Sequence, residues 1–240
     1  MVPKLQASGW DKSPHAINEQ RTFTDGRIVF VGGKARRGKQ KRSDYLLRFN
    51  PDFPIAGVEA KSRYRHAAEG LQHSKEYAEI LGLRFAYSTN GIDIVEFDYT
   101  SGIERTIGDF PSPDDLWARL RRVDGILDDR VADQLLTPTF PDRTKPLRYY
   151  QEIAVNRAVQ AALQGRTRAL LTLCTGAGKT AVAFQICWKL WTARWNPQGE
   201  HRKPKILFLA DRNLLVDQPK DGIFSQFGDA RHKIESGQVV

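Results

Sequence analysis

Short runs of apolar and β-branched residues, separated by turn residues, follow one another along the first 110 positions, after an expected N-terminal helix. Such runs are typical of strands, and Asp-Gly or Asn-Gly between two of them favours a tight turn. Residues 66–81 differ, because their apolar side chains recur at helical spacing. This order predicts an α/β domain with a mixed sheet. The predicted strands are a hairpin over residues 23–31, then residues 43–49, 55–61, 84–89 and 92–99.

The pattern changes after residue 147, where helical segments alternate with short, continuous apolar runs. Apolar runs of this kind predict strands that are buried on both faces, and helices between them predict parallel pairing. We therefore expect the opening of a doubly wound parallel sheet. The expected elements are a helix over 148–163, a strand over 169–174, a glycine-rich loop, a helix over 179–195, a strand over 206–210 and a further helix.

Two changes in composition suggest domain boundaries. Residues 109–114 are rich in turn formers, and residues 137–146 hold three prolines and resemble a linker. Residues 114–136 between them have a helical pattern, with Ser112 or Pro113 near its start. We predict a first domain over 1–110, a helical connector and linker over 111–146, and an incomplete second domain over 147–240.

The charge of the chain favours a polyanionic partner. The net charge is +9 and the isoelectric point about 9.6, and cations that meet phosphates release condensed counterions. No apolar run is long enough to span a membrane, and two cysteines make no disulfide framework, so we expect a cytoplasmic protein. A basic stretch is the candidate phosphate contact, although a solvated loop without a partner is the alternative. Its cations are Lys34, Arg36, Arg37, Lys39, Lys41, Arg42 and Arg48.

Three residues on two predicted neighbouring strands form a candidate hydrolytic centre. Glu59 and Lys61 are two apart, so they share one face of a strand, and pairing with the preceding strand can bring Asp44 beside them. Two converging carboxylates suit Mg²⁺, which prefers oxygen ligands, and Lys61 can act on a water or on a phosphate. The short pattern alone is also compatible with a surface salt bridge.

Several stretches around these residues resemble the PD-(D/E)xK nuclease domain of type I restriction enzyme R subunits. They are Thr22 to Ile28, Lys39 to Leu47, Val58 to Lys61, Gly70 to Gln72, Tyr77 to Leu81 and Ser88 to Gly91. The resemblance implies that Asp44, Glu59 and Lys61 are the catalytic set, with Asp44 and Glu59 as metal ligands. It suggests Glu19, expected on the first helix, as an additional acid.

The chain departs from this family at one motif, a Gln-x3-Tyr sequence on the helix after the catalytic strand. His73 stands four residues before Tyr77, with Gln72 beside it. His73 and Tyr77 share a helix face, and an imidazole can hydrogen-bond as an amide does. Either His73 or Gln72 fills this position, unless His73 only packs on the sheet.

A glycine-rich loop, Thr175-Gly-Ala-Gly-Lys-Thr180, lies between a predicted strand and a helix. Gly176 and Gly178 let backbone N–H groups close around a phosphate, with Ala177 between them. Lys179 would reach the β- and γ-phosphates of ATP, and Thr180 would ligate Mg²⁺. Leu173 stands where the strict motif has glycine, and the shorter form resembles superfamily 2 helicases.

Two flanking segments also resemble those helicases. Residues 147–152 are similar to their Q motif, which implies that Gln151 binds the adenine edge while Arg148 or Tyr149 packs on the ring; an ordinary helix start is the alternative. Residues 206–218 resemble the segment that contacts the DNA backbone, with Arg212 as the contact.

The resemblance implies a type I site-specific deoxyribonuclease subunit that uses Mg²⁺ and ATP. Its implied fold is a restriction-endonuclease-like domain followed by an incomplete RecA-like domain, and its partners are double-stranded DNA and the methylation and specificity subunits. A helicase-type ATPase with a non-nucleolytic first domain and a truncated, non-catalytic binding protein are the alternatives. The 240 residues contain neither an Asp-Glu-x-His segment nor a second RecA-like lobe. We therefore expect weak nucleotide binding without DNA-stimulated hydrolysis, and apolar strand faces near Leu170 and Leu207 that stay uncovered.

Overall fold

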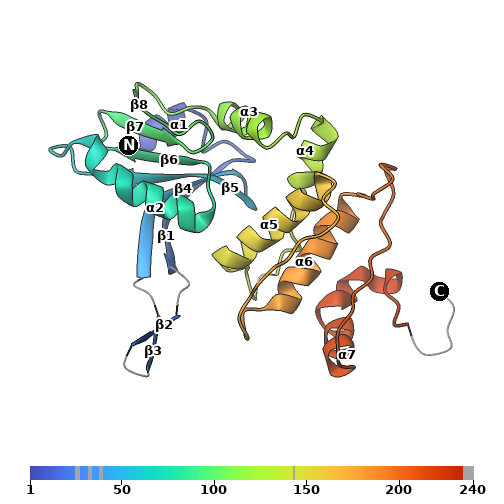
Figure 1. Cartoon of the computed structure of the whole chain (residues 1–240). Coiled ribbons are helices and arrows are strands. Elements are labelled where there is room, and N and C mark those ends of the chain that lie inside the picture. Colours follow the sequence, from blue (N-terminus) through green and yellow to red (C-terminus); the bar gives the residue numbers. More distant parts are fainter. Residues whose placement is uncertain (25–27, 32–33, 38–39, 143, 235–240) are drawn as a thin grey trace. The chain divides into compact units, whose positions relative to one another are not determined.

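The computed structural model describes residues 1–24, 28–31, 34–37, 40–142 and 144–234, and the side chains of residues 21–41 lie outside this description. The chain forms two compact units, Met1–Pro138 and Thr139–Val240 (Figure 1). The boundary between the units falls within the proline-rich segment 137–146. None of the helices in the described ranges is long and apolar enough to cross a membrane.

Unit 1 is built on a six-stranded sheet with the order β1-β4-β5-β6-β7-β8. Only the pair β5–β6 is parallel, and the other neighbours are antiparallel. A parallel pair needs a crossover, which η1 (Ala67–Gly70) and α2 (Leu71–Leu81) supply. The predicted mixed α/β sheet is therefore confirmed. The strands are β1 (Ala16–Thr24), β4 (Gln40–Asn50), β5 (Phe53–Ala60), β6 (Phe85–Thr89), β7 (Ile94–Asp98) and β8 (Ile103–Ile107).

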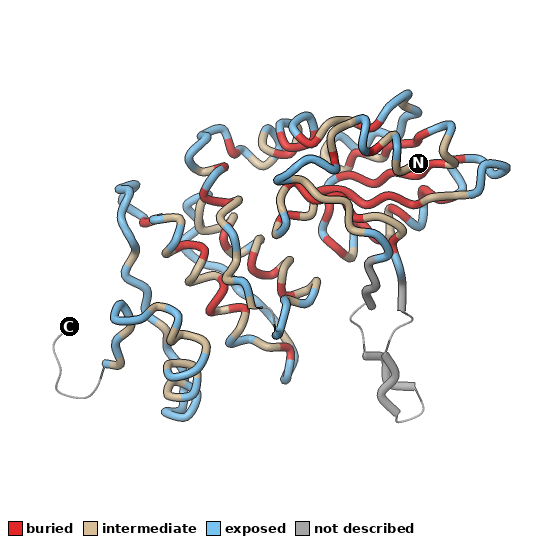
Figure 2. Tube along the Cα trace, turned by 180° about the vertical axis from the view of Figure 1, so that it is seen from behind, coloured by how far each residue is buried: buried red, intermediate tan, exposed pale blue. Residues whose placement is uncertain are grey.

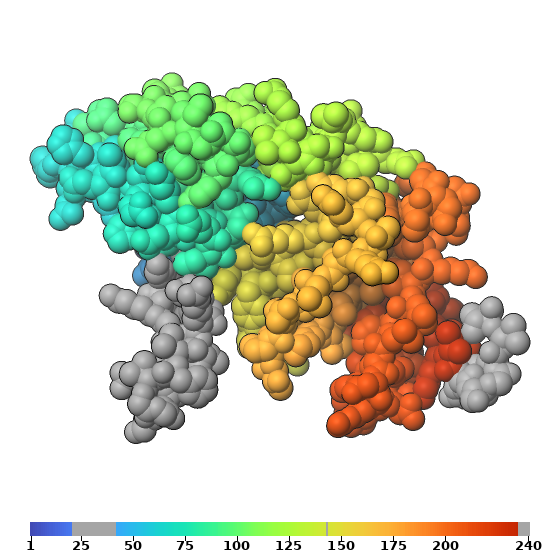
Figure 3. Space-filling model, viewed as in Figure 1, coloured from blue at the N-terminus to red at the C-terminus, as the bar shows by residue number. Residues whose placement is uncertain are grey.

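Helices cover the sheet, and its central strands are buried (Figure 2). The helix α2 packs against β5, β6 and β7, and η1 and α2, in teal, are seen on the surface of this face of unit 1 (Figure 3). On α3 (Pro113–Val123), the ring of Trp117 stacks on Phe49 of β4, with centroids 4.8 Å apart. Ser112 caps α3, since its hydroxyl accepts a hydrogen bond from the Asp115 N–H. The connector continues in α4 (Asp129–Leu135), as the helical pattern predicts.

Two expectations for the first 31 residues are wrong. The N-terminal helix α1 covers only Val2–Ala7, and Glu19 lies on strand β1. Eight register pairs with β4 satisfy the backbone of β1, and this tertiary pairing overrides local preference. The predicted hairpin over 23–31 is also absent, because β2 (Ile28–Val31) pairs with β3 (Lys34–Arg37) and not with β1. Its turn, at residues 25 and 26, lies outside the described residues.

Unit 2 contains helices without a sheet in its described part, 139–142 and 144–234. The helices α5 (Tyr149–Leu163) and α6 (Lys179–Thr192) pack together, as do α7 (Leu214–Asp221) and η2 (Ile223–Ala230). The expected strands over 169–174 and 206–210 are wrong for this structure, since both segments lack ladder pairing. A parallel strand depends on its neighbours for hydrogen bonds, and neither segment has one here.

The apolar side chains of these two segments remain in contact with solvent. Leu170 is 93% exposed and Leu207 is 65% exposed. The apolar interior of unit 2 lies elsewhere, around Phe184 of α6, whose ring contacts Phe140, Phe224 and Phe227. These apolar side chains are therefore uncovered, as expected, although the two segments do not form the predicted strands.

Candidate active site

The middle of β4 places an acid against the backbone at the end of the neighbouring strand β5. Asp44 stands one step beyond the register pair Tyr45–Val58 and faces Glu59 across the two strands. Its Oδ2 accepts a hydrogen bond from the N–H of Ala60 at 2.8 Å. The half-buried carboxylate thus replaces a ladder partner and is fixed beside the end of β5.

Glu59 and Lys61 project together from the end of β5, as their spacing predicts. The ammonium of Lys61 donates to Oε1 of Glu59 at 2.8 Å. The backbone N–H of Lys61 donates to the carbonyl of Thr89 at 2.7 Å, which ties this strand end to the end of β6. Asp44, Glu59 and Lys61 therefore form one cluster at the edge where the two parallel strands end.

The carboxylate of Glu59 is held in an unfavourable environment. Burial raises its pKa above the usual glutamate value, the hydrogen bond from Lys61 opposes this, and the negative charge of Asp44 adds to the increase. Its second oxygen, Oε2, is buried without a hydrogen-bond partner. A buried carboxylate oxygen without a partner is costly, so this atom suits a cation.

The residues present suit a hard divalent cation that keeps several of its waters, and not a metal held entirely by protein ligands. No group of three His, Cys, Asp or Glu side chains suited to a metal occurs in the described ranges, so the cluster offers the carboxylates of Asp44 and Glu59. Mg²⁺ keeps several waters and takes only one or two carboxylates, which matches this set.

Helix α2 places two further predicted residues near the acids. Burial raises the pKa of Tyr77, and the charges of Glu59 and Asp44 raise it further. The charge of His73 acts on Glu59 in the opposite sense, lowering its pKa. The His73 and Tyr77 rings share a helix face with centroids 6.4 Å apart; Tyr77 is buried, whereas His73 and Gln72 are both exposed. His73 and Tyr77 are therefore close enough to the acids for their charges to interact.

Glu19 is not brought to this cluster. It pairs in register with Tyr45, the neighbour of Asp44, and its charge helps to raise the pKa of Tyr45 after burial. Successive side chains alternate between faces, so Glu19 points to the other face of the sheet.

Among the predicted phosphate contacts, Arg42 is exposed and Arg48 is buried, donating to Asn18 and to the Pro51 carbonyl. The side chains of Lys34, Arg36, Arg37, Lys39 and Lys41 lie outside the described residues.

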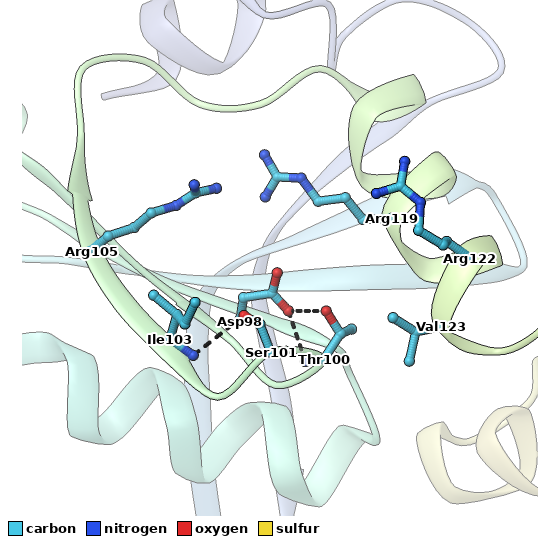
Figure 4. A pocket seen from close by; sticks show the side chains of 8 residues that line it. All are labelled: Asp98, Thr100, Ser101, Ile103, Arg105, Arg119, Arg122 and Val123. Carbon is cyan, nitrogen blue, oxygen red and sulfur yellow. Dashed lines mark hydrogen bonds between the residues drawn. The ribbon is translucent and has the colours of Figure 1, made fainter.

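A pocket of about 280 Å³ lies elsewhere in unit 1, between the β7–β8 turn and α3 (Figure 4). Arg105, Arg119 and Arg122 line it, together with Asp98. Glu59 pairs with Ser88, and Ser88 pairs with Val95, so these three side chains project from one face of the sheet. Side chains alternate between faces along a strand, so Asp98, three residues after Val95, projects from the opposite face. Two of the pocket's arginines, Arg105 and Arg119, already form ion pairs with Glu96, so they have a structural role in the sheet.

In unit 2, the glycine-rich loop precedes α6 in the expected way. Gly176 and Gly178 have φ angles of +75° and +79°, which favour glycine. The exposed Lys179 begins α6, and its ammonium donates to the Cys174 carbonyl at 3.1 Å. Thr175 and Thr180 are exposed and Ala177 is buried. An exposed lysine and threonine at a helix N-terminus fit a nucleotide phosphate and its Mg²⁺.

Gln151 supports this loop from α5. Its Nε2 donates to the Ala177 carbonyl at 2.8 Å, and its Oε1 accepts from the Arg148 N–H at 2.9 Å. Both ends of the amide are therefore used inside unit 2, and the side chain is buried. Arg148 donates to the Tyr150 hydroxyl, Tyr149 is half-buried, and Arg212 is exposed just before α7.

Comparison with known proteins relates the chain to restriction enzymes. Residues 144–239 match the family model described as "Type III restriction enzyme, res subunit". The whole chain is 36% identical over 248 aligned positions to the type I restriction enzyme EcoAI endonuclease subunit of Escherichia coli. A solved fragment from Vibrio vulnificus, described as an HsdR subunit of a type I restriction enzyme, has a TM-score of 0.84 and 56% identity over 98% of this chain. The chain is homologous to type I restriction endonuclease subunits along its whole length. It spans 29% of the EcoAI subunit and 42% of the Vibrio fragment.

A shorter match supports the same relationship. The EcoKI endonuclease subunit of Escherichia coli K12 is 39% identical over 72 residues, which is 30% of this chain and 6% of that protein.

The sequence assigns no role to Gly70 and Ser88, although both lie in stretches that resemble the nuclease family. The structure places both against Glu59, Ser88 through the pairing of β5 with β6 and Gly70 through the packing of η1 on these strands.

Proposed function

We propose that this chain is the nuclease-bearing part of a type I restriction endonuclease subunit, with unit 1 as a PD-(D/E)xK nuclease of restriction-endonuclease-like fold. The observation that carries this proposal is the cluster of Asp44, Glu59 and Lys61, in which Glu59 Oε2 is buried without a partner. The substrate is double-stranded DNA, consistent with the net charge of +9. The methylation and specificity subunits are the partners, and the protein works in the cytoplasm.

Asp44 and Glu59 would hold Mg²⁺, which supplies an activated water and stabilises charge on the phosphate. The residues of the chain perform the remaining tasks. The hydrogen bond from Ala60 orients Asp44, and burial keeps the Glu59 carboxylate away from bulk water. The ammonium of Lys61 pairs with Glu59, and 21% of the Lys61 side chain is exposed, so it can also donate to a phosphodiester oxygen or hold the attacking water. The bond that breaks is the phosphorus–oxygen bond of the DNA backbone.

We also propose that residues 147–240 begin a RecA-like domain that binds ATP and, in the full-length subunit, takes part in DNA translocation. The support is the loop geometry at Gly176 and Gly178, with Lys179 and Thr180 at the start of α6. Arg212 would contact the DNA backbone. In this proposal Gln151 has two roles. It binds the adenine of the nucleotide, and it supports the loop through its hydrogen bond to the Ala177 carbonyl.

The nuclease proposal is tested with purified chain, supercoiled plasmid and Mg²⁺. Asp44→Asn keeps an oxygen that accepts from the Ala60 N–H but removes the charge, so its fold should persist while nicking is lost. Asp11→Asn, at an exposed acid outside the cluster, is the matched control and should nick as the wild type does. Equal nicking by Asp44→Asn and wild type, or no metal-dependent nicking by the wild type, would contradict the proposal.

The nucleotide proposal is tested by titrating a fluorescent ATP analogue with Mg²⁺. Lys179→Ala should weaken binding by about tenfold or more, since it removes a charge-assisted contact to phosphate. Lys205→Ala, at an exposed lysine before the 206–210 segment, is the control and should bind normally. Identical binding by Lys179→Ala and wild type would rule out this loop as the phosphate site.

A further inference from the structure

Ser88 on β6 has a buried hydroxyl that makes no hydrogen bond within unit 1. Its side chain is 0% exposed, and its Oγ is buried without a hydrogen-bond partner. In the described part of the chain, one other buried side-chain atom shares this condition, and it is Oε2 of Glu59. Buried polar atoms are normally bonded, so two exceptions on adjacent residues point to a common purpose.

The strand register places the two residues side by side. Glu59 and Ser88 are partners in the parallel pair β5–β6, and partners in register project from the same face. Asp44 faces Glu59 from β4 on the other side. One row across three neighbouring strands therefore reads Asp44, Glu59, Ser88.

The backbone of Gly70 closes over this row. A Cβ atom at Gly70 would lie 2.4 Å from Ser88 Oγ, 2.9 Å from Lys61 Cε and 3.0 Å from Glu59 Cγ. Only glycine permits so close an approach, and the three side chains converge on the same small region. The Ser88 hydroxyl is consequently enclosed with the carboxylate and the lysine.

A structural role does not explain this hydroxyl. A buried hydroxyl without a partner destabilises the folded state, so alanine would serve the fold at least as well. Ser74 on α2 provides the contrast within the same unit. It is equally buried, but its hydroxyl donates to the Gly57 carbonyl at 3.1 Å and so supports the packing of the helix on β5.

We propose that Ser88 is a positioning residue of the nuclease site, whose hydroxyl holds the Glu59 carboxylate and the Lys61 ammonium in place when Mg²⁺ and a phosphodiester bind. This inference rests on the nuclease function proposed above. A serine hydroxyl can donate to the carboxylate and accept from the ammonium, so it can serve both groups. Partners of metal-binding carboxylates orient them, and removing such partners weakens metal binding by about 10- to 100-fold.

The test compares Ser88→Ala, Ser88→Cys and Ser74→Ala with the wild type. Calorimetric titration with MgCl₂ measures metal binding, plasmid nicking measures cleavage as a function of Mg²⁺ concentration, and melting in EDTA measures the stability of the metal-free protein. Ser88→Ala should bind Mg²⁺ about tenfold or more weakly, yet melt at the same or a higher temperature. Ser88→Cys places a somewhat larger group, a weak donor and acceptor, at the same position, and should bind Mg²⁺ as weakly as Ser88→Ala does.

Ser74→Ala should show the reverse pattern, with a lower melting temperature and an unchanged response to Mg²⁺. If Ser88→Ala or Ser88→Cys binds Mg²⁺ and nicks DNA as the wild type does, the positioning role of Ser88 is wrong while the nuclease proposal stands. If the wild type itself neither binds Mg²⁺ nor nicks DNA, the nuclease proposal fails, and the inference about Ser88 fails with it.

Discussion

The carboxylate of Asp44 accepts the backbone N–H of Ala60 at 2.8 Å, so an acid of the candidate site also acts as a structural hydrogen-bond acceptor. This double role separates the effects of two substitutions. Asp44→Ala leaves a half-buried N–H without its partner and should lower the free energy of unfolding by about 1–3 kcal/mol. Asp44→Asn keeps an acceptor and should cost less.

Urea unfolding in EDTA measures both variants without the influence of metal. The prediction is wrong if the alanine and asparagine variants are equally stable. Nicking distinguishes the chemical role from the structural one, because both variants should be inactive although they differ in stability.

The buried Glu59 gives a prediction for pH. Because burial raises the pKa of Glu59, the folded state binds this proton more tightly than the unfolded state. The free energy of unfolding contributed by this group is therefore lost as the pH rises through the folded pKa. Glu59→Gln cannot titrate, so its stability relative to the wild type should increase from acidic to neutral pH in EDTA.

The control is Glu104→Gln on β8, where the carboxylate pairs with Lys75 and half of the side chain is exposed. This variant controls for the loss of one negative charge at an exposed position. A difference between Glu59→Gln and wild type that stays constant with pH would show that Glu59 has no unusual proton affinity.

A buried ion network should dominate the stability of unit 1. Glu96 is 0% exposed and accepts from the Tyr87 hydroxyl at 2.6 Å, while Arg105 and Arg119 pair with it. Glu96→Ala removes the acceptor for all three groups and should cost about 3–5 kcal/mol. Glu104→Ala breaks an exposed pair and should cost at most about 1 kcal/mol. Chemical denaturation of both variants checks the ranking, and similar costs would contradict it.

Two glycines of unit 2 have nearly the same φ and differ in their surroundings. Gly178 has a φ of +79°, and a Cβ there would lie 2.4 Å from Gln151 Nε2. Gly165 has a φ of +74°, with nothing within 4 Å of such an atom. Gly165→Ala should cost only the left-handed strain of about 1–2 kcal/mol. Gly178→Ala should cost more and should also weaken binding of the ATP analogue.

The variant Gly178→Ala combined with Gln151→Ala isolates the contact. Relief of the clash should make the two substitutions non-additive in free energy of unfolding. Strict additivity would show that Gln151 does not press on the loop.

Sequence reasoning found the elements whose pattern is local. Asn90-Gly91 lies between β6 and β7, as the Asn-Gly pair between two apolar runs predicts. The spacing of Glu59 and Lys61 also places both on one face, because alternation along a strand is fixed by covalent geometry. These features need no information from distant parts of the chain.

Features that depend on distant pairing could not be read in this way. Strand β1 depends on pairing with β4, which the local sequence does not indicate, so the sequence places Glu19 on a helix instead. Ser88 joins the acidic cluster through the register of β5 with β6, which no local pattern specifies. The apolar segments 169–174 and 206–210 have strand composition but no strand neighbours, so composition alone predicts a sheet that unit 2 does not contain.

The hydrogen bond from the Lys61 N–H to the Thr89 carbonyl has a consequence during synthesis. The ribosome releases Asp44, Glu59 and Lys61 before it has made the strand that anchors them. Parallel pairing of β5 with β6 must wait for η1 and α2 to fold back, which makes it a late, non-local step. A nascent chain that ends before Thr89 therefore carries the three side chains without the partner strand that receives the Lys61 N–H.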